Sequence, residues 1–271
     1  MRLVSFESDA GPRAGVLLNG RVEPVAGERT MEAVLAAGPL DGLETGGESL
    51  ALDEVTLLPP LTRPGKIVCI GLNYRAHAEE QGKEAPETPA IFAKFANALV
   101  GPGRTLTLPP WTENVDYEAE VAFVIGARAS GVLEADALDY IAGYTLFNDL
   151  SARDYQFRTP QWMPGKIFDG AAPCGPALVT PDEAGPHDAI GIGLTLNGET
   201  MQESSTADLV HSIPALVAYL SRLMTLEPGD LVATGTPSGV GMHRDPPVWL
   251  RAGDEVKVTS PQLGVLETTF V

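Results

Sequence analysis

Residues 115 to 126, VDYEAEVAFVIG, restrict the fold more than any other part of this chain. Acidic and apolar residues alternate there with the period of two that is typical of a β-strand, so Asp116, Glu118 and Glu120 project from one face. The same face continues into the apolar residues of a core strand. Burying neighbouring carboxylates costs on the order of several kcal/mol for each uncompensated charge. The segment therefore predicts a fold that brings a compensating group to this face.

A hard divalent cation would offset the repulsion between these carboxylates. Glu118 and Glu120 point to the same side, and Asp149 follows a second apolar strand in the segment FNDLSARDYQ. Carboxylate oxygens are the ligands that Mg²⁺ or Mn²⁺ prefers, with water or substrate in the remaining positions. The three residues are a candidate metal site. The alternative is an edge strand whose acidic face is hydrated.

The charge of the chain excludes some classes of partner. Its 271 residues include 36 acidic and 18 basic ones, for a formal net charge of −18, which disfavours binding to nucleic acid or to anionic membranes. Neither a membrane-spanning apolar run nor a signal peptide is visible, so we expect a cytoplasmic protein. Lysine is scarce, and Lys94 and Lys166 stand out because both lie within dense motifs.

Strand patterns dominate the predicted secondary structure. Residues 1 to 60 contain two strands and a short helix that begins after Thr30, and a proline-rich stretch then separates them from the rest. The remainder is mostly alternating or apolar strands, with one clear amphipathic helix near residues 213 to 224. The sequence predicts a β-rich α+β fold with few helices: a small N-terminal α/β appendage over residues 1–60 and a main domain over residues 65–271.

A polar segment from Tyr74 to Ala90 lies between two apolar strands and is typical of a surface flap. His77 and Glu80 are three residues apart in it, close enough on one helical turn for the carboxylate to orient the imidazole. The pair is a candidate general base for a water molecule if the flap covers a pocket. The alternative is a solvated loop in which neither residue has a chemical role.

Two further segments carry candidate substrate contacts. Arg153 and Gln156 follow Asp149 at helical spacing, and Ser151 with Asp154 resembles a capping box that would place Asp149 just before a helix. Arg153 is suited to a bidentate contact with a carboxylate, and Gln156 adds a neutral donor. Later in the chain, ATGTPSGVG is a glycine-rich turn whose backbone N–H groups and hydroxyl could cradle an anion; its candidate residues are Gly235 and Thr236.

Taken together, these motifs resemble the short form of the fumarylacetoacetate hydrolase family. The matching pieces are GLNYRAHAEE, IFAKFANALVGPG, VDYEAEVAFVIG, FNDLSARDYQ, GKIFD and GTPSGVG, in this order over residues 65 to 241. The resemblance implies a mixed β-roll fold, one Mg²⁺ or Mn²⁺ in each subunit and a homodimer. It implies metal ligands at Glu118, Glu120 and Asp149, a lid dyad of His77 and Glu80, and substrate contacts from Arg153, Gln156, Lys166 and Thr236, with Asp116 only flanking the ligands.

The resemblance also implies a class of reaction. A small anionic 2-oxo or enol acid would bind the metal, and Lys166 with Arg153 would neutralise the charge that develops as a bond breaks. We expect a hydrolase that cleaves a C–C bond of an acylpyruvate through a metal-bound enolate, with His77 activating water. The alternatives are isomerisation or decarboxylation of a 2-hydroxy-dienedioate or oxaloacetate in the same site, and a non-catalytic metal-binding scaffold.

Overall fold

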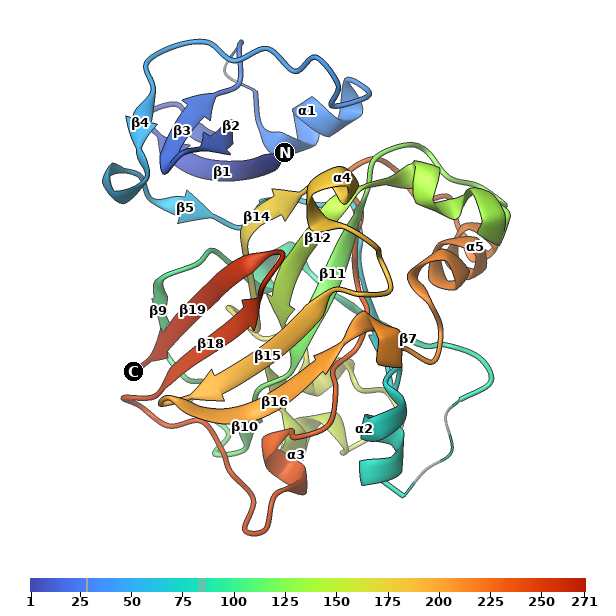
Figure 1. The fold of residues 1–271 in the computed structure, drawn as a ribbon. Helices are drawn as coiled ribbons and strands as arrows, with labels where there is room; N and C mark the ends of the chain where they lie inside the picture. The colour runs from blue at the N-terminus through green and yellow to red at the C-terminus, as the bar shows by residue number, and fades with distance from the viewer. Residues whose placement is uncertain (28, 83, 85) are drawn as a thin grey trace.

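A computed structural model describes residues 1–27, 29–82, 84 and 86–271 of the chain. One large sheet runs through the molecule (Figure 1), in the strand order β4-β3-β2-β1-β14-β12-β11-β17-β6-β7. Two short strands, β5 and β8, pair with β1 and β14 respectively. The bounds are β1 Arg2–Ser8, β2 Gly11–Leu18, β3 Arg21–Pro24, β4 Leu50–Ala51, β5 Leu57–Leu58, β6 Ile67–Gly71, β7 Ala90–Lys94, β8 Leu99–Val100, β11 Ala119–Ile125, β12 Ile141–Asn148, β14 Ala172–Val179 and β17 Leu231–Ala233.

A second sheet packs against the middle of the first one. Its strand order is β16-β15-β18-β19-β9, and it contacts β11, β12 and β14 through β15, β18 and β19. Most pairs in both sheets are antiparallel, whereas β17 with β6, β14 with β8 and β19 with β9 are parallel. The predicted β-rich α+β fold with mixed sheets is therefore confirmed. The bounds are β9 Arg104–Leu106, β15 Gly191–Leu196, β16 Glu199–Ser205, β18 Glu255–Ser260 and β19 Gly264–Phe270.

The helices are short. The longest, α5, begins after Ser212, whose hydroxyl accepts a hydrogen bond from the Ala215 N–H, and it buries the apolar face that its sequence predicts. No helix among the described residues is long and apolar enough to cross a bilayer. The α-helices are α1 Met31–Ala36, α2 Arg75–Glu80, α3 Arg153–Gln156, α4 Pro181–Ala184 and α5 Ile213–Leu223, and the 3₁₀ segments are η1 Leu52–Glu54, η2 Ala96–Ala98, η3 Glu134–Tyr140, η4 Met163–Gly165, η5 Thr206–Asp208 and η6 Gly241–His243.

The N-terminal unit continues the main sheet. Strands β1 to β5 and helix α1 all lie within residues 1–60, and β1 pairs with β14 where Leu3 faces Leu178. Figure 1 shows this unit at one end of the molecule, far from α2 and α3. The boundary between residues 60 and 65 stays a prediction.

The predicted strand 115–126 is divided in two. Its first part, β10 (Val115–Asp116), leaves the main sheet and pairs with β13 (Ser151–Ala152), whereas β11 stays in the sheet. Side chains satisfy the backbone N–H groups at the break: Asn148 accepts from Glu118 and Gln202 accepts from Ala119. Asp116 therefore belongs to the β10–β13 pair, whereas Glu120 lies in β11.

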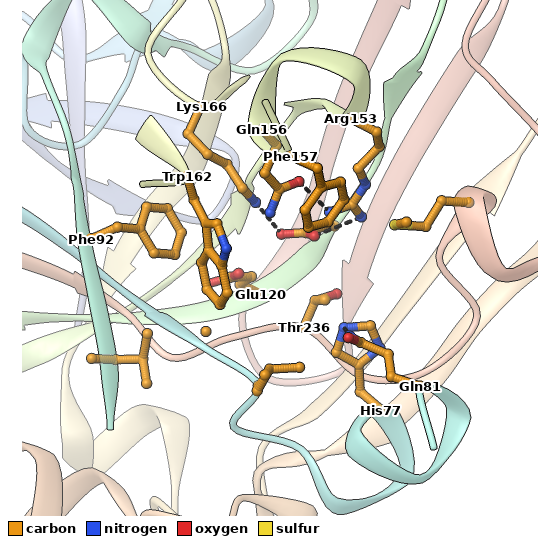
Figure 2. Close-up of a pocket in the computed structure, with 15 residues that line it drawn as sticks. His77, Gln81, Phe92, Glu120, Arg153, Gln156, Phe157, Trp162, Lys166 and Thr236 are labelled. Atoms are coloured by element: carbon orange, nitrogen blue, oxygen red, sulfur yellow. Dashed lines mark hydrogen bonds and ion pairs between the residues drawn. The ribbon is translucent and has the colours of Figure 1, made fainter. Parts of the chain in front are cut away.

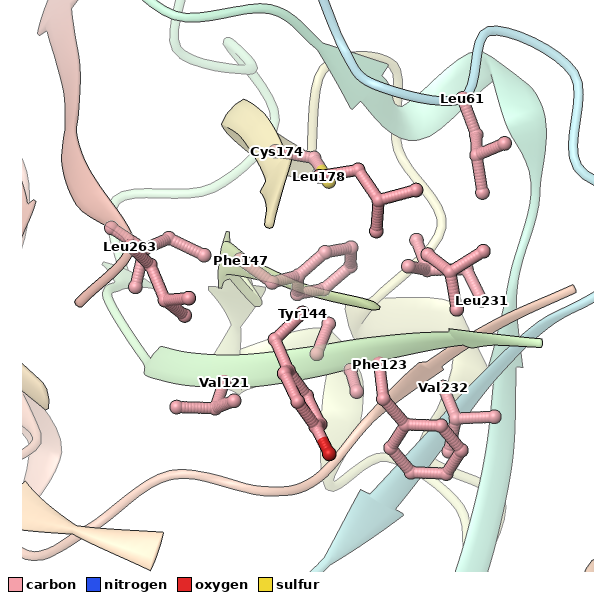
Figure 3. Close-up of a cluster of buried hydrophobic side chains, with 14 of the residues drawn as sticks. Leu61, Val121, Phe123, Tyr144, Phe147, Cys174, Leu178, Leu231, Val232 and Leu263 are labelled. Atoms are coloured by element: carbon pink, nitrogen blue, oxygen red, sulfur yellow. The ribbon is translucent and has the colours of Figure 1, made fainter. Parts of the chain in front are cut away.

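The core lies between the two sheets and around the middle strands of the larger one (Figure 3). All positions of β11 and β12 are buried, so both faces of these strands are covered, unlike the single buried face that alternation suggests. Phe123, Tyr144 and Phe147 are the large side chains at this place. Glu118 and Glu120 thus lie at the end of a strand that is buried on both faces.

We expect Phe123→Ala to lower the free energy of unfolding by about 3–5 kcal/mol, because it leaves a cavity at a position that is 0% exposed. Leu133→Ala is the control, since Leu133 is 70% exposed and its truncation should change little. Urea denaturation of both variants measures the difference. Equal stability of the two variants would contradict the packing described here.

Candidate active site

Strand pairing brings the three predicted metal ligands together. The start of β11 lies beside the end of β12, with Ala119 opposite Asn148, so Glu118 and Glu120 come next to Asp149. The Asp149 N–H donates to the Glu118 carbonyl over 2.9 Å and fixes this junction. One carboxylate oxygen from each of the three lies within 4.8 Å of the others, and all three residues are buried. Like charges this close together and this deep need cations nearby.

Two lysines supply part of that positive charge. Lys166 Nζ lies 2.7 Å from Glu118 Oε2 and 2.8 Å from Asp149 Oδ2, and Lys94 Nζ donates to the other oxygen of Asp149. Burial alone would lower the pKa of Lys166, but Asp149 and Glu118 outweigh it and raise the pKa. Lys166 is therefore an ammonium ion at neutral pH.

Arg153 forms ion pairs with Asp116 and Glu118, one acid on each side of the strand break. Its Nε lies 2.8 Å from Asp116 Oδ2, and its Nη2 lies 2.7 Å from Glu118 Oε1. Nη1 donates to the side-chain oxygen of Gln156 over 2.9 Å, which joins the two predicted substrate contacts in one network. Burial alone would raise the pKa of Glu118, but Lys166 and Arg153 hold it well below its usual range.

The helix that carries Arg153 is one turn long, and it starts differently from the predicted capping box. Asp149 does precede the helix, but the capping residue is Ala152 and makes no side-chain hydrogen bond. Ser151 instead donates its hydroxyl to the carbonyl of Asp149 over 2.8 Å. The reason is that Ser151 is already paired in β13, so its side chain stabilises the turn after β12 rather than the helix.

Glu120 is the unbalanced member of the triad. Its Oε2 accepts a hydrogen bond from the Gly235 N–H over 2.9 Å, and within the described parts of the chain it forms no ion pair. Burial, followed by the charges of Asp149 and Glu118, raises the pKa of Glu120 well above its ordinary value. A buried carboxylate with a raised pKa beside two carboxylates in ion pairs fits a site that gains a divalent cation. Glu118, Glu120 and Asp149 would hold it.

His77, Glu80 and Gln81 form a second group on and just after α2. His77 Nδ1 lies 2.9 Å from Glu80 Oε2, and His77 Nε2 lies 2.9 Å from the Gln81 side-chain nitrogen. The other oxygen of Glu80 accepts from the Gly239 N–H over 2.9 Å, which ties α2 to the glycine-rich turn. Burial alone would raise the pKa of Glu80, but the hydrogen bonds from His77 and Gly239 lower it.

These groups line one pocket (Figure 2). Lys166, Gln156 and Arg153 lie on one side of it, and His77, Gln81 and Thr236 lie together on another. Aromatic side chains complete the wall of the pocket: Phe92 and Trp162 lie together, and Phe157 lies near Arg153. A methyl group at position 71 would overlap the Trp162 ring, so Gly71 leaves the space that the indole occupies.

The structure brings all ten predicted site residues to this region, but it uses Gly235 and Thr236 differently from a simple anion cradle. The Gly235 N–H is donated to Glu120, and Gln202 donates its amide to the Thr236 hydroxyl over 2.8 Å. Gly235 has φ of +98°, and a Cβ there would lie 2.9 Å from the Ile70 carbonyl oxygen. The turn therefore positions Glu120, one of the candidate metal ligands. Contact with substrate stays a prediction for Gly235 and Thr236.

Sequence reasoning assigned no role to several residues that complete the site. Lys94 was visible only through the scarcity of lysine, and Gln81 only through its spacing of four residues from His77. Asp116, predicted to flank the ligands, is fully buried and accepts from Arg153 and from the N–H groups of Gly241 and Met242. Nothing local in the sequence marks Trp162 as a pocket wall.

Two family profiles together cover nearly the whole chain. The profile described as "Fumarylacetoacetate (FAA) hydrolase C-terminal" matches residues 66–271. The profile described as "Rv2993c-like, N-terminal" matches residues 1–60.

Individual relatives match this chain over most of their own length. The mitochondrial oxaloacetate tautomerase FAHD2A of Bos taurus is 42% identical over 98% of this chain and 90% of its own length. Among solved structures, a 5-carboxymethyl-2-hydroxymuconate delta-isomerase from Mycobacterium smegmatis is 34% identical, with a TM-score of 0.85 over 100% of this chain and 99% of that one. A fumarylacetoacetate hydrolase from Exiguobacterium antarcticum is 32% identical, with a TM-score of 0.89 over the same shares.

We expect Glu118→Gln to weaken Mn²⁺ binding by more than about 100-fold, because it removes one of three anionic ligands and frees Lys166 and Arg153 to repel the ion. Titration calorimetry of chelator-treated protein measures the affinity. Glu113→Gln, at an exposed position, is the matched control. An unchanged affinity in the Glu118 variant would show that the ion binds elsewhere.

The raised pKa of Glu120 predicts a pH-dependent stability in the absence of metal. The folded protein holds a proton on Glu120 more tightly than the unfolded chain does, so this residue costs stability as the pH rises above the ordinary pKa of glutamate. Glu120→Gln removes that cost. With a chelator present, its melting temperature should exceed that of the wild type increasingly as the pH rises through this window, and a difference independent of pH would argue against a raised pKa.

Proposed function

Because this chain belongs to the fumarylacetoacetate hydrolase family, we propose that it is a metal-dependent enzyme that interconverts the keto and enol forms of a small 2-oxo dicarboxylic acid such as oxaloacetate. The observation that carries the proposal is a single pocket with an ammonium and a buried carboxylate cluster on one side and an oriented histidine on the other. The bovine relative, named as an oxaloacetate tautomerase, supports this choice of substrate.

The charged side of the pocket would bind and orient the substrate. Lys166, held by Glu118 and Asp149, presents its ammonium group to the oxygen at which negative charge develops. Gln156 and Arg153 offer amide and guanidinium groups for a carboxylate. A Mg²⁺ or Mn²⁺ ion on the three acids would, when bound, polarise the 2-oxo group and so acidify the neighbouring C–H.

The histidine side would move the proton. In the keto-to-enol direction, Nε2 of His77 takes a proton from C3 of the substrate, and the C2 oxygen receives one from the Lys166 ammonium. The enol keeps every atom of the keto acid, and the enzyme is restored when His77 gives its proton to solvent and Lys166 regains one from solvent. Glu80 holds the Nδ1 side of the imidazole and stabilises the cation that forms when Nε2 is protonated.

A second candidate is hydrolysis of a C–C bond in an acylpyruvate. The observation that favours it is the aromatic wall of Phe92, Phe157 and Trp162. Such a wall is better suited to the apolar acyl end of an acylpyruvate than to the second carboxylate of a dicarboxylic acid. In this reaction His77 would take a proton from water, and the products would be a carboxylic acid and pyruvate. Decarboxylation of oxaloacetate in the same site would release CO₂ without an attacking water.

The remaining expectations concern partners and location. We propose a small anionic 2-oxo or enol acid as the ligand, with no nucleic-acid or membrane partner, in line with the net charge of −18. The homodimer and the cytoplasmic location stay predictions. The name of the bovine relative places that protein in mitochondria.

The test is turnover of oxaloacetate by chelator-treated protein with and without added Mn²⁺, followed by the absorbance of the enol. His77→Gln should lower kcat/KM by about 100-fold or more, the usual contribution of a general base. His187→Gln, the same change in a loop away from the pocket, is the control. Release of pyruvate from acetylpyruvate, with no effect on the enol, would instead support hydrolysis. Metal-independent turnover, or full activity of His77→Gln, would refute the proposal.

A further inference from the structure

The imidazole of His77 is held at both of its nitrogen atoms. Nδ1 lies 2.9 Å from a carboxylate oxygen of Glu80, and Nε2 lies 2.9 Å from the side-chain nitrogen of Gln81, the residue that ends α2. The Gln81 N–H also donates to the His77 carbonyl over 3.3 Å, which fixes the two backbones relative to each other. The mechanism above uses Nε2 and Glu80 but gives Gln81 no role.

The partners decide which nitrogen carries the proton. Glu80 has a lowered pKa, so it is ionised at neutral pH and only accepts hydrogen bonds. Nδ1 must therefore carry the hydrogen, and in a neutral imidazole Nε2 then carries the lone pair. A lone pair needs a donor, and the amide NH₂ of Gln81 is the donor placed beside it.

We propose that Gln81 is a positioning residue for His77: its amide holds the neutral Nδ1–H tautomer with the lone pair of Nε2 directed into the pocket. The inference rests on the proposed function for the use of that lone pair as a base. The side chain of Gln81 lines the same pocket as His77 and Thr236 (Figure 2), so an incoming substrate takes the place of the amide at Nε2.

The other groups around His77 explain why an amide serves here. Glu80 lies on the same helix, His243 on η6 has its ring centroid 6.1 Å from that of His77, and Glu118 and Arg153 line the pocket opposite. A carboxylate at position 81 would only accept, so it would draw a second proton onto Nε2 and convert the base into a cation. An apolar side chain there would leave the ring held at Nδ1 alone.

Two substitutions at Gln81 test its contribution. Gln81→Glu should move the rise of kcat/KM to higher pH, because the extra carboxylate stabilises the imidazolium ion. Gln81→Met removes the donor at similar size, so kcat should fall about 10-fold with KM little changed. The same two substitutions at Gln161 are the controls, since Gln161 is exposed and outside this pocket.

A double variant, Glu80→Gln with Gln81→Glu, exchanges the two partners without changing the net charge. The amide introduced at position 80 can accept from the Gly239 N–H, as Glu80 does now, and donate to Nδ1. The carboxylate introduced at position 81 then accepts from Nε2. The lone pair thus moves to the nitrogen that is bonded to residue 80, and kcat should fall by about 100-fold although the net charge around the histidine is unchanged.

Nitrogen NMR of histidine-labelled protein without substrate reads the tautomer directly, and the chain has only four histidines. The proton of neutral His77 should lie on Nδ1 in the wild type and on Nε2 in the double variant. A wild type with the proton on Nε2, or wild-type kcat in the double variant and in Gln81→Met, would overturn the inference. The NMR measurement needs no turnover. If the wild type converts no 2-oxo acid, the proposed function fails, and the position of the His77 proton still tests the role of Gln81.

Discussion

The antiparallel pairing of β11 with β12 is the constraint on which the rest of the site depends. It places Glu118 and Glu120, at the start of one strand, against Asp149, at the end of the other, in the best-packed part of the larger sheet. Carboxylates in such a place are tolerable only with cations beside them, because the interior cannot screen their repulsion. Lys94, Lys166 and Arg153 reach the cluster from three separate elements and hold those elements together through it. The charged cluster is in this sense part of the architecture as well as of the chemistry.

The three acids of the cluster differ in how their charge is balanced. Glu118 is bound by Lys166 and Arg153, and Asp149 by both lysines, whereas Glu120 has a backbone N–H donor and, among the described residues, no cationic partner. The ion pairs hold the pKa of Glu118 low, and burial raises the pKa of Glu120. Such a pocket is ready to exchange a proton for a divalent cation. Across it lies the His77–Glu80 pair, the proposed base, and a hydrogen bond from the Gly239 N–H holds Glu80 in place.

Much of the fold follows from local patterns. Residues 2–8, 67–71, 90–94, 141–148 and 255–260, which form strands, carry the apolar or alternating residues typical of strands, and the helix at 213–223 lies where an amphipathic pattern predicts it. Strand β14 was not predicted, since Pro173, Gly175 and Pro176 interrupt its apolar residues. The break between β10 and β11 was also invisible, because it depends on side chains of Asn148 and Gln202 that are remote in the sequence.

The sequence by itself determined the family and the candidate residues of the site. The spacing of its acids, its few lysines, the His77 and Glu80 pair and the glycine-rich turn are together typical of one family, and the acids among them are suited to a divalent metal. Only the tertiary structure decided which cation faces which acid: that Arg153 is bound to Asp116 and Glu118, that Lys94 belongs to the cluster, and that Gln81 lies against Nε2 of His77. The physical reason is that residue types and their periodicity specify what a segment can do locally, whereas charge balance is a property of side chains that meet only when distant segments pack.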